Sequence, residues 1–228
     1  MVTPAQLRYQ QEPANGSGLR SRKKLRTRHA IQDAALELFV DQGYEATTVE
    51  QIAARVEVSP TTFFRYFGSK SEVIKGDQGE RLPELQRAIV GRPAEEDDLE
   101  VLRVAIQQEW ISSIDPGRTL RQAMVIAASP ELRGVSFEIG YQWRGAISES
   151  LAQRHGLEIP DDRCVFAAST VMSVFWRAVE SWRRGGAQDD LADHFDRGFE
   201  LMIGLCAEWA SSHAAGVGTP ARGGRRTG

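Results

Sequence analysis

The side chains best suited to bind a polyanion lie in the first third of the chain. Basic residues recur over positions 20–28, and a segment that begins at Ser59 carries hydroxyl, aromatic and guanidinium groups in close succession. Arginine and lysine donate to phosphate oxygens, and an arginine can hold the O6 and N7 atoms of guanine with two parallel hydrogen bonds. The chemistry that these residues offer is therefore reversible hydrogen bonding to a nucleic acid.

Residues for covalent or metal chemistry show no comparable grouping. The four histidines are scattered, and the sequence contains no nucleophile elbow, phosphate loop or metal-ligand spacing. The two cysteines, Cys164 and Cys206, stand in apolar helical patterns, which is typical of buried thiols in a reducing compartment. We therefore expect neither an enzyme nor a bound metal or cofactor.

The net charge is divided unevenly along the sequence. It is −3 over the whole chain, +3 over residues 1–75 and −6 over the remainder. A basic end on an otherwise acidic chain fits a protein that docks a polyanion at one end only. The composition, 41% hydrophobic and 26% charged, is that of a folded globular protein.

Two helices are expected before the Ser59 segment. Apolar residues at helical spacing predict a first helix over 25–42, which ends at Gly43. Thr47 followed by Glu50 predicts a capping box at the start of the second helix.

Two more helix starts follow after a short turn. Ser59 is expected to cap a third helix with Pro60 at its first position, where a missing N–H is harmless. Gly68 ends that helix, and Ser69 with Glu72 predicts a capping box that opens a fourth. Short helices joined by such tight turns are typical of a helix-turn-helix domain.

Helical spacing continues through the rest of the chain, and we expect an all-α fold of about nine helices. Further helix starts are predicted at the acidic run Glu95–Asp98 and at Asp115-Pro116, Ser129-Pro130, Asp161-Asp162 and Asp189-Asp190. The expected domains are a flexible basic arm over 1–24, a helix-turn-helix domain over 25–72, a ligand-binding and dimerisation domain over 73–213, and a disordered tail over 214–228.

The order of these motifs resembles the tetracycline-repressor (TetR) family. The resemblance rests on Leu36 to Phe39, Gly43-Tyr44, Thr47 to Val49, Gln51 to Ala54, Val58-Ser59, Thr62 to Phe67 and Ser69-Lys70. It implies that the third helix recognises DNA, and that a dimeric body binds a small molecule that releases the DNA. Where the family commonly has a phosphate-binding tyrosine, this sequence has Phe64, which cannot donate a hydrogen bond.

A second resemblance concerns the body. Gly76-Asp77, the segment from Ser129 to Arg133 and Trp182 are similar to a subgroup associated with acyl-CoA-like ligands, which includes the mycofactocin-associated regulators. This similarity implies a lipophilic effector.

The third helix should present its N-terminal residues to the major groove. Phe63 and Phe67 are expected to face inward, and Arg65 either contacts guanine or holds a phosphate. The basic run follows the DNA backbone or enters the minor groove, or is simply solvated. The DNA-binding residues expected are Arg22, Lys23, Lys24, Arg26, Thr48, Ser59, Pro60, Thr61, Thr62, Phe64, Arg65, Tyr66 and Lys70.

The middle helices carry apolar residues interleaved with a few polar ones, as a ligand pocket requires. The alternative is plain core packing. Arg118, Arg121 and Arg144 would hold an acidic group of the ligand or lie in solvent. The expected pocket residues are Ile106, Trp110, Ile114, Met124, Phe137, Tyr141, Phe166, Thr170 and Ser173.

The last two helices carry apolar residues over long stretches, which predicts a four-helix interface between two copies of the chain. Gly198 and Gly204 would permit close approach of backbones. The expected interface residues are Val171, Phe175, Val179, Trp182, Phe195, Phe199, Met202, Leu205 and Trp209.

These interpretations combine into one expected function. The chain would be a cytoplasmic repressor that binds palindromic double-stranded operator DNA as a homodimer and is released by a lipophilic small molecule. The ligand would shift the fourth helix and so change the separation of the recognition helices. No membrane partner is expected, since no apolar run approaches about 18 residues. The alternative is a DNA-binding activator or architectural protein without a small-molecule switch.

Overall fold

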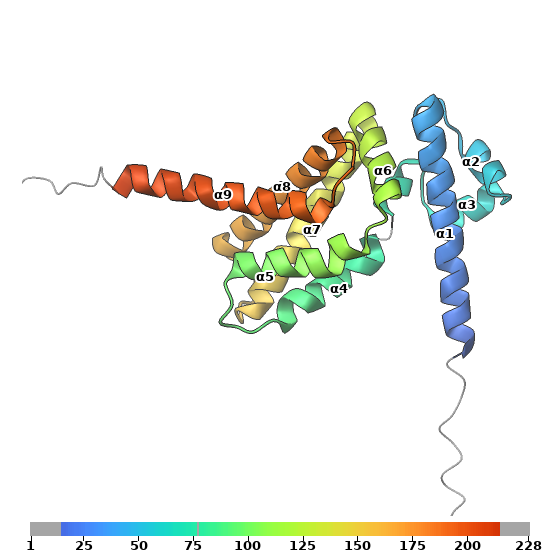
Figure 1. Ribbon diagram of the computed structural model, residues 1–228. Helices are drawn as coiled ribbons and strands as arrows, with labels where there is room; N and C mark the ends of the chain where they lie inside the picture. Colours follow the sequence, from blue (N-terminus) through green and yellow to red (C-terminus); the bar gives the residue numbers. More distant parts are fainter. Residues whose placement is uncertain (1–14, 77, 215–228) are drawn as a thin grey trace, which may run out of the picture. The chain divides into compact units, whose positions relative to one another are not determined.

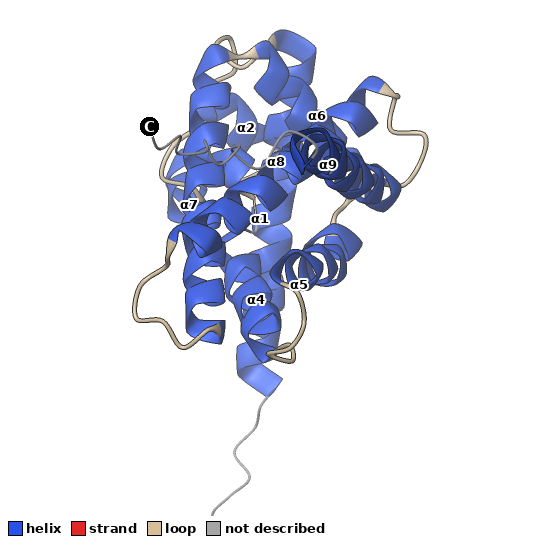
Figure 2. Cartoon of the chain, turned by 90° about the vertical axis from the view of Figure 1, so that its left-hand side faces the viewer, coloured by secondary structure: helices blue, strands red, loops and turns tan. Residues whose placement is uncertain are grey.

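The computed structural model describes residues 15–76 and 78–214, and within these ranges the chain is helical throughout, without strands (Figures 1 and 2). The nine α-helices are α1 (Asn15–Gln42), α2 (Val49–Arg55), α3 (Pro60–Tyr66), α4 (Gln78–Gly91), α5 (Asp98–Ala105), α6 (Pro116–Ala128), α7 (Pro130–Arg154), α8 (Asp162–Arg184) and α9 (Leu191–Ala214). Three shorter turns are the 3₁₀ turn η2 (Ser71–Lys75), the π-helical turn η3 (Ile106–Trp110) and the 3₁₀ turn η4 (Ile111–Ser113). The first part of the expected arm, Asp77 and the expected tail from residue 215 lie outside the described residues.

The chain divides into two compact units. The head unit contains residues up to Gly79 together with Gly117–Ile139, and the body unit contains Glu80–Pro116 and the residues from Gly140 on. The sequence places one domain boundary at residue 72, whereas most of α6 and the first two fifths of α7 belong with the head. Sequence periodicity could not indicate this, because it carries no information about which distant segments pack together.

The core of the head unit joins α1 to the two short helices. Ile31 and Leu36 of α1, Ile52 of α2, and Phe63 and Phe67 of α3 and its C-cap are almost completely buried. Each such side chain contributes about 1.5–3 kcal/mol when it leaves water. The two phenylalanines therefore fix which face of α3 remains outside.

The capping signals fix most helix starts as expected, with one shift. Ser59 accepts a hydrogen bond from Thr62 N, and Asp161 accepts one from Cys164 N at the start of α8. The capping box of α2 is formed by Thr48 with Gln51, one residue later than predicted. Thr47 is buried and instead donates its hydroxyl proton to the carbonyl of Gly43, 2.8 Å away.

Two other boundaries differ from the sequence prediction. Residues 15–24, expected to be part of a flexible arm, form the first turns of α1. Ser69 does accept from Glu72 N, but the turn that follows is η2, and α4 begins only at Gln78. Gly76 separates the two with a positive φ of 53°, a conformation that interrupts a right-handed helix.

An aromatic cluster forms the core of the body unit. Trp110, at the end of η3, stacks against Trp143 of α7 and Phe175 of α8, with ring centroids 3.7 and 4.2 Å apart. Phe195 and Phe199 of α9 continue the cluster through edge-to-face contacts. Aromatic pairs of this kind add about 0.5–1.5 kcal/mol each beyond the area they bury.

Helix α9 packs on α8 only along its first half. A Cβ atom added to Gly198 would lie 2.9 Å from Val174 of α8, so the two backbones approach closely there. From Ile203 to His213 every residue is exposed, and Figure 1 shows this end of α9 extending beyond the other helices of its unit. Within the described ranges, no helix has both the length and the apolar character that a membrane span requires.

Candidate nucleic-acid interface

Helix α3 presents one polar and aromatic face outward. Pro60, Thr61, Phe64 and Arg65 are exposed, while Phe63 is buried. Phe64 is 53% exposed, which is unusual for so large an apolar side chain and leaves its ring free to contact a thymine methyl group. The guanidinium of Arg65 lies over the ring of Tyr66, 5.5 Å from its centroid. The outward and inward faces are those that the sequence predicts.

The hydroxyl groups at the two helix starts are engaged in capping. Thr48 is exposed and accepts from Gln51 N, while Ser59 donates to the hydroxyl of Thr62. The Thr48 hydroxyl, which only accepts a bond, can still donate its proton to a phosphate, whereas Ser59 would have to turn its proton away from Thr62; both lie beside the free N–H groups of a helix start. Their placement at exposed helix N-termini is therefore consistent with the phosphate contacts expected of them.

Lys70 is placed differently from the expectation. Its ammonium group donates to the carbonyls of Tyr44 and Thr47, 2.6 and 2.8 Å away, and lies 4.0 Å from the centre of the Tyr44 ring. These contacts tie the start of η2 to the turn after α1. Lys70 is thus a structural residue of the head, and a phosphate contact has to share its ammonium with two carbonyls.

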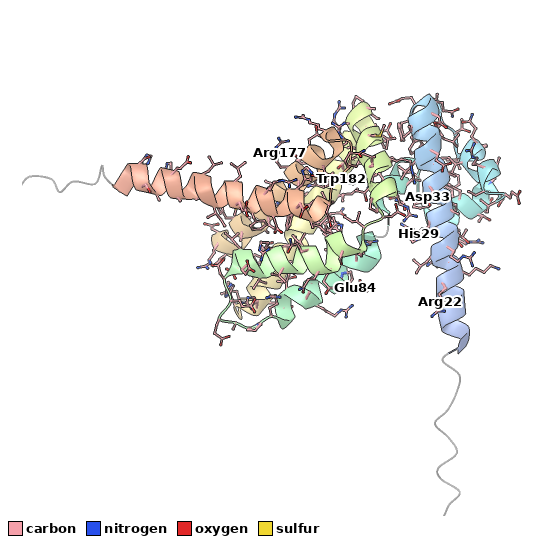
Figure 3. All side chains as sticks on the ribbon, viewed as in Figure 1. Arg22, His29, Asp33, Glu84, Arg177 and Trp182 are labelled. Atoms are coloured by element: carbon pink, nitrogen blue, oxygen red, sulfur yellow. The ribbon has the colours of Figure 1, made fainter. Side chains whose placement is uncertain are left out.

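The basic run is helical. The side chains of Arg22, Lys23, Lys24 and Arg26 are all exposed on the first turns of α1, and Figure 3 labels Arg22 near that end. A helix is too wide for the minor groove, so in this conformation the run is suited to phosphate contacts.

Arg28, at the end of the same run, has a role that sequence reasoning missed. It donates to the carbonyls of Tyr66 and Gly76 and stacks on Phe67, 4.4 Å from the ring centroid. It therefore fixes the C-terminal end of α3. Its position in a basic run gave no signal that separates it from its solvated neighbours.

The expected pocket residues differ in burial. Ile106 and Trp110 belong to the buried core of the body unit, and Ile114 and Thr170 are partly buried. The other five are exposed on α6, α7 and α8, so the prediction that they line an interior pocket is corrected, because helical spacing alone does not show whether a side chain is buried. These residues are Met124, Phe137, Tyr141, Phe166 and Ser173.

The arginines expected to hold an acidic ligand group are also corrected. Arg118 and Arg121 pair with Asp33 of α1, and Arg144 lies over the ring of Tyr141 at 4.7 Å. The partner of the first two is a carboxylate of the chain itself, 85 residues away for Arg118, which helical spacing could not reveal.

The expected interface residues separate into two groups. Six of them are buried in the chain's own core, so the wide apolar faces of α8 and α9 mostly serve internal packing and these six are corrected; they are Val171, Phe175, Val179, Trp182, Phe195 and Phe199. Met202 is partly buried, whereas Leu205 and Trp209 are 57% and 64% exposed.

No group of histidine, cysteine and carboxylate side chains in the described part of the chain is suited to hold a metal ion. What the geometry offers is an exposed recognition face on a tightly held helix, next to a basic helix. That arrangement is suited to bind a polyanion.

Comparison with known proteins agrees with this geometry. Residues 31–75 match the model of the bacterial regulatory proteins of the tetR family, and residues 99–205 match the MftR C-terminal domain. The regulator TcmR of Streptomyces glaucescens is 34% identical over 71% of this chain and 73% of its own length. MftR of Mycobacterium tuberculosis, named as a regulator of mycofactocin biosynthesis, is 30% identical over 72% of this chain and 83% of its own.

Solved structures share the fold at lower identity. The repressor NalD of Pseudomonas aeruginosa matches 79% of this chain and 96% of its own with 20% identity and a TM-score of 0.56. The fatty acid degradation regulator FadR of Bacillus halodurans matches 78% and 94% with 20% identity and a TM-score of 0.52. Two relatives are at least 30% identical and are matched over more than two thirds of their own length, and the helix-turn-helix head matches the tetR family model. The chain therefore belongs to the TetR family and is a DNA-binding transcriptional regulator.

Proposed function

We propose that this regulator is a ligand-responsive repressor that binds a palindromic operator as a homodimer and is released by a lipophilic small molecule. The observation that carries the proposal is the outward face of α3, where Thr61, Phe64 and Arg65 are exposed over a buried Phe63. A short helix held in this way presents its first residues to base edges in the major groove.

Contacts on either side of α3 hold the DNA backbone. Thr48 and Ser59 lie at the exposed N-termini of α2 and α3, where free N–H groups favour a phosphate. The basic first turns of α1 add four cationic side chains, Arg22, Lys23, Lys24 and Arg26. Such contacts fix the register on DNA and make binding salt-dependent.

The dimer uses the end of α9. Leu201, Ile203, Leu205 and Trp209 are each more than half exposed there, and a soluble chain seldom leaves such residues together in water. A second copy covers them by the same surface, as twofold symmetry requires.

The effector is lipophilic, and an acyl-CoA is the class that we propose. Support comes from the body, which matches the MftR C-terminal domain and whose core around Trp110 is aromatic. The π-helical turn η3 carries this tryptophan, and such irregular turns are frequent at functional sites.

The test is operator binding by the purified protein, with DNA from its own genomic neighbourhood, at several salt concentrations and with or without palmitoyl-CoA. Palindrome-dependent binding that weakens with salt and is relieved by palmitoyl-CoA supports the whole proposal. Specific binding that ignores palmitoyl-CoA rejects the acyl effector but keeps the operator. Binding that is weak and independent of sequence rejects the operator proposal.

A further inference from the structure

An ion pair joins α6 to the first helix of the head. Arg118 donates to both carboxylate oxygens of Asp33, from Nε at 2.7 Å and from Nη2 at 2.9 Å, and Arg121 lies 3.6 Å from the same carboxylate. Two parallel bonds between a guanidinium and a carboxylate fix orientation as well as distance. Asp33 lies on α1 one turn after His29 (Figure 3). Its carboxylate faces α6 and not α3, the helix that contacts DNA bases in the proposed function.

Side-chain donors also hold the segment by which the chain leaves the recognition helix. Gln122 of α6 donates to the carbonyl of Ile74, and Gln32 of α1 donates to that of Val73 at 3.1 Å. Arg28 holds the carbonyl of Gly76 at 2.8 Å. Three positions of the η2 exit, Val73, Ile74 and Gly76, are thereby held by α1 and α6 together.

The start of α7 is tied to the head as well. The hydroxyl of Tyr44 donates to Glu131 at 2.6 Å, and Ser129 donates to Glu45 at 3.2 Å. Burial and the Glu131 carboxylate raise the pKa of Tyr44 to about 12, so the phenol stays a donor throughout the physiological range. We call the pairs Asp33–Arg118, Ile74–Gln122 and Tyr44–Glu131 the corner clamp.

Helix α7 continues from the clamp without a break into the body unit. Its residues up to Ile139 belong to the head unit and those from Gly140 on to the body unit, where Trp143 stacks on Trp110. The other two passages between the units, at Gly79–Glu80 and Pro116–Gly117, lie at or beside helix starts.

We propose that the corner clamp sets the orientation of the recognition helix, so that Asp33, Arg118 and Glu131 are positioning residues for operator binding although none of them lies on the outward face of α3. This inference rests on the proposed binding of a dimer to two half-sites, because the clamp then controls which half-site spacing fits.

The experiment compares Arg118→Gln and Asp33→Asn with the wild type. Glu37→Gln is the matched control, since it removes the same charge as Asp33→Asn from the same helix but breaks only an exposed contact to Arg55 at 3.4 Å. Binding is measured to operators whose half-sites are moved apart or together by one base pair, and to a single half-site. Amide hydrogen exchange is measured over residues 71–76 and over α8. The exchange of α8 verifies that the body stays folded.

The wild type and Glu37→Gln should prefer one spacing by at least about tenfold. Both clamp variants should reduce that preference to within about threefold, keep half-site binding within about twofold, and exchange faster over residues 71–76 with α8 unchanged. Unchanged spacing preference and unchanged exchange in both variants would overturn the clamp while leaving the proposed function intact. If the wild type shows no spacing preference, the palindromic operator is rejected instead. Hydrogen exchange over residues 71–76 then becomes the test of the clamp, and unchanged exchange in both variants would overturn it.

Discussion

At the scale of single residues, Arg65 is the α3 side chain best placed to contact a base edge. It is exposed on the outward face, and an arginine that holds guanine with two bonds contributes about 1–3 kcal/mol of discrimination. Arg65→Ala should therefore lower affinity for the operator about 5- to 150-fold and for unrelated DNA much less, as measured by fluorescence anisotropy.

The control for this prediction is Arg184→Ala, which removes an exposed arginine of the body unit that pairs with Glu180. An equal loss for all DNA sequences, together with a shallower salt dependence, would show that Arg65 holds a phosphate.

Lys70 is expected to act on stability more than on DNA. Its ammonium is the donor for two carbonyls, and Lys70→Met leaves both without it, which costs about 1–3 kcal/mol. The midpoint of urea unfolding should fall accordingly. Lys24→Met, a change on the exposed face of α1, should leave the midpoint unchanged and weaken DNA binding instead. An unaltered midpoint for Lys70→Met would restore Lys70 as a phosphate ligand.

At the scale of helices, the sequence predicts starts better than partners. Ser59-Pro60 and Asp161 mark their helices correctly because a cap is a local contact between residues three positions apart. Thr47 and Thr48 are equivalent in sequence, and burial of the first decides which one caps α2. The outward face of α3 follows from periodicity in the same local way.

The interface and pocket residues were predicted less well for the opposite reason. An apolar stripe shows that a helix face is covered, but it does not show whether the chain itself or a second copy covers it. Phe195 and Trp209 look alike in sequence, yet one is fully buried and the other 64% exposed. The Asp33–Arg118 pair depends on chain segments far apart, which no local pattern specifies.

The packing of α8 on α9 yields a matched pair of glycine substitutions. Gly→Ala favours a helix by about 1 kcal/mol at either position, but the Cβ at Gly198 would lie 2.9 Å from the stiff side chain of Val174. At Gly204 nothing lies within 4 Å. Gly198→Ala should therefore be less stable than Gly204→Ala by about 1–3 kcal/mol in denaturant unfolding. Equal stabilities would show that α8 and α9 can move apart at Gly198 enough to accommodate the added methyl group.

The free energy that the Asp33–Arg118 ion pair between α1 and α6 contributes to folding should depend on pH. Partial burial acts to raise the pKa of Asp33, but the hydrogen bonds and charge of Arg118, with Arg121 and His29, bring it below its usual range. A lowered pKa means that the pair stabilises the fold at pH values above about 4 and loses this effect as the pH falls through the folded value. The difference in unfolding free energy between wild type and Asp33→Asn should thus be largest near neutral pH and shrink below about pH 4.

The unfolding free energy of Asp33→Asn has to be subtracted from that of the wild type, because other carboxylates titrate in the same pH range. The pKa values of Glu72, Glu100 and Glu180 are also lowered, chiefly by hydrogen bonds from Lys75, Arg103 and Arg183 respectively. Their loss in acid affects both proteins alike. A difference that stays constant from neutral pH to pH 3 would mean that the Asp33 carboxylate is not stabilised by its ion pair.

At the scale of the whole molecule, the proposed function requires that two chains act together. A single helix-turn-helix makes fewer contacts with DNA than a pair does, and two heads that are fixed at one separation bind two half-sites at once. The exposed end of α9 and the corner clamp then have complementary roles. In the proposed function the first joins two chains, and in the inference drawn above the second determines how each head is held.

Assembly of the proposed dimer is therefore expected to depend on Leu205 and Trp209. Complete burial of such a side chain contributes about 1.5–3 kcal/mol, and both side chains are already partly covered within their own chain. Each substitution occurs twice in a symmetric dimer, so each variant should lose about 2–4 kcal/mol of dimerisation free energy. Leu205→Ala and Trp209→Ala should each raise the dimer dissociation constant by about 30- to 1000-fold in sedimentation over a concentration series, and operator affinity should fall with the population of dimer. The control is Phe137→Ala on α7, which removes a side chain that is 75% exposed. If that control dissociates the dimer and the α9 variants do not, the subunits meet along α7 instead of α9.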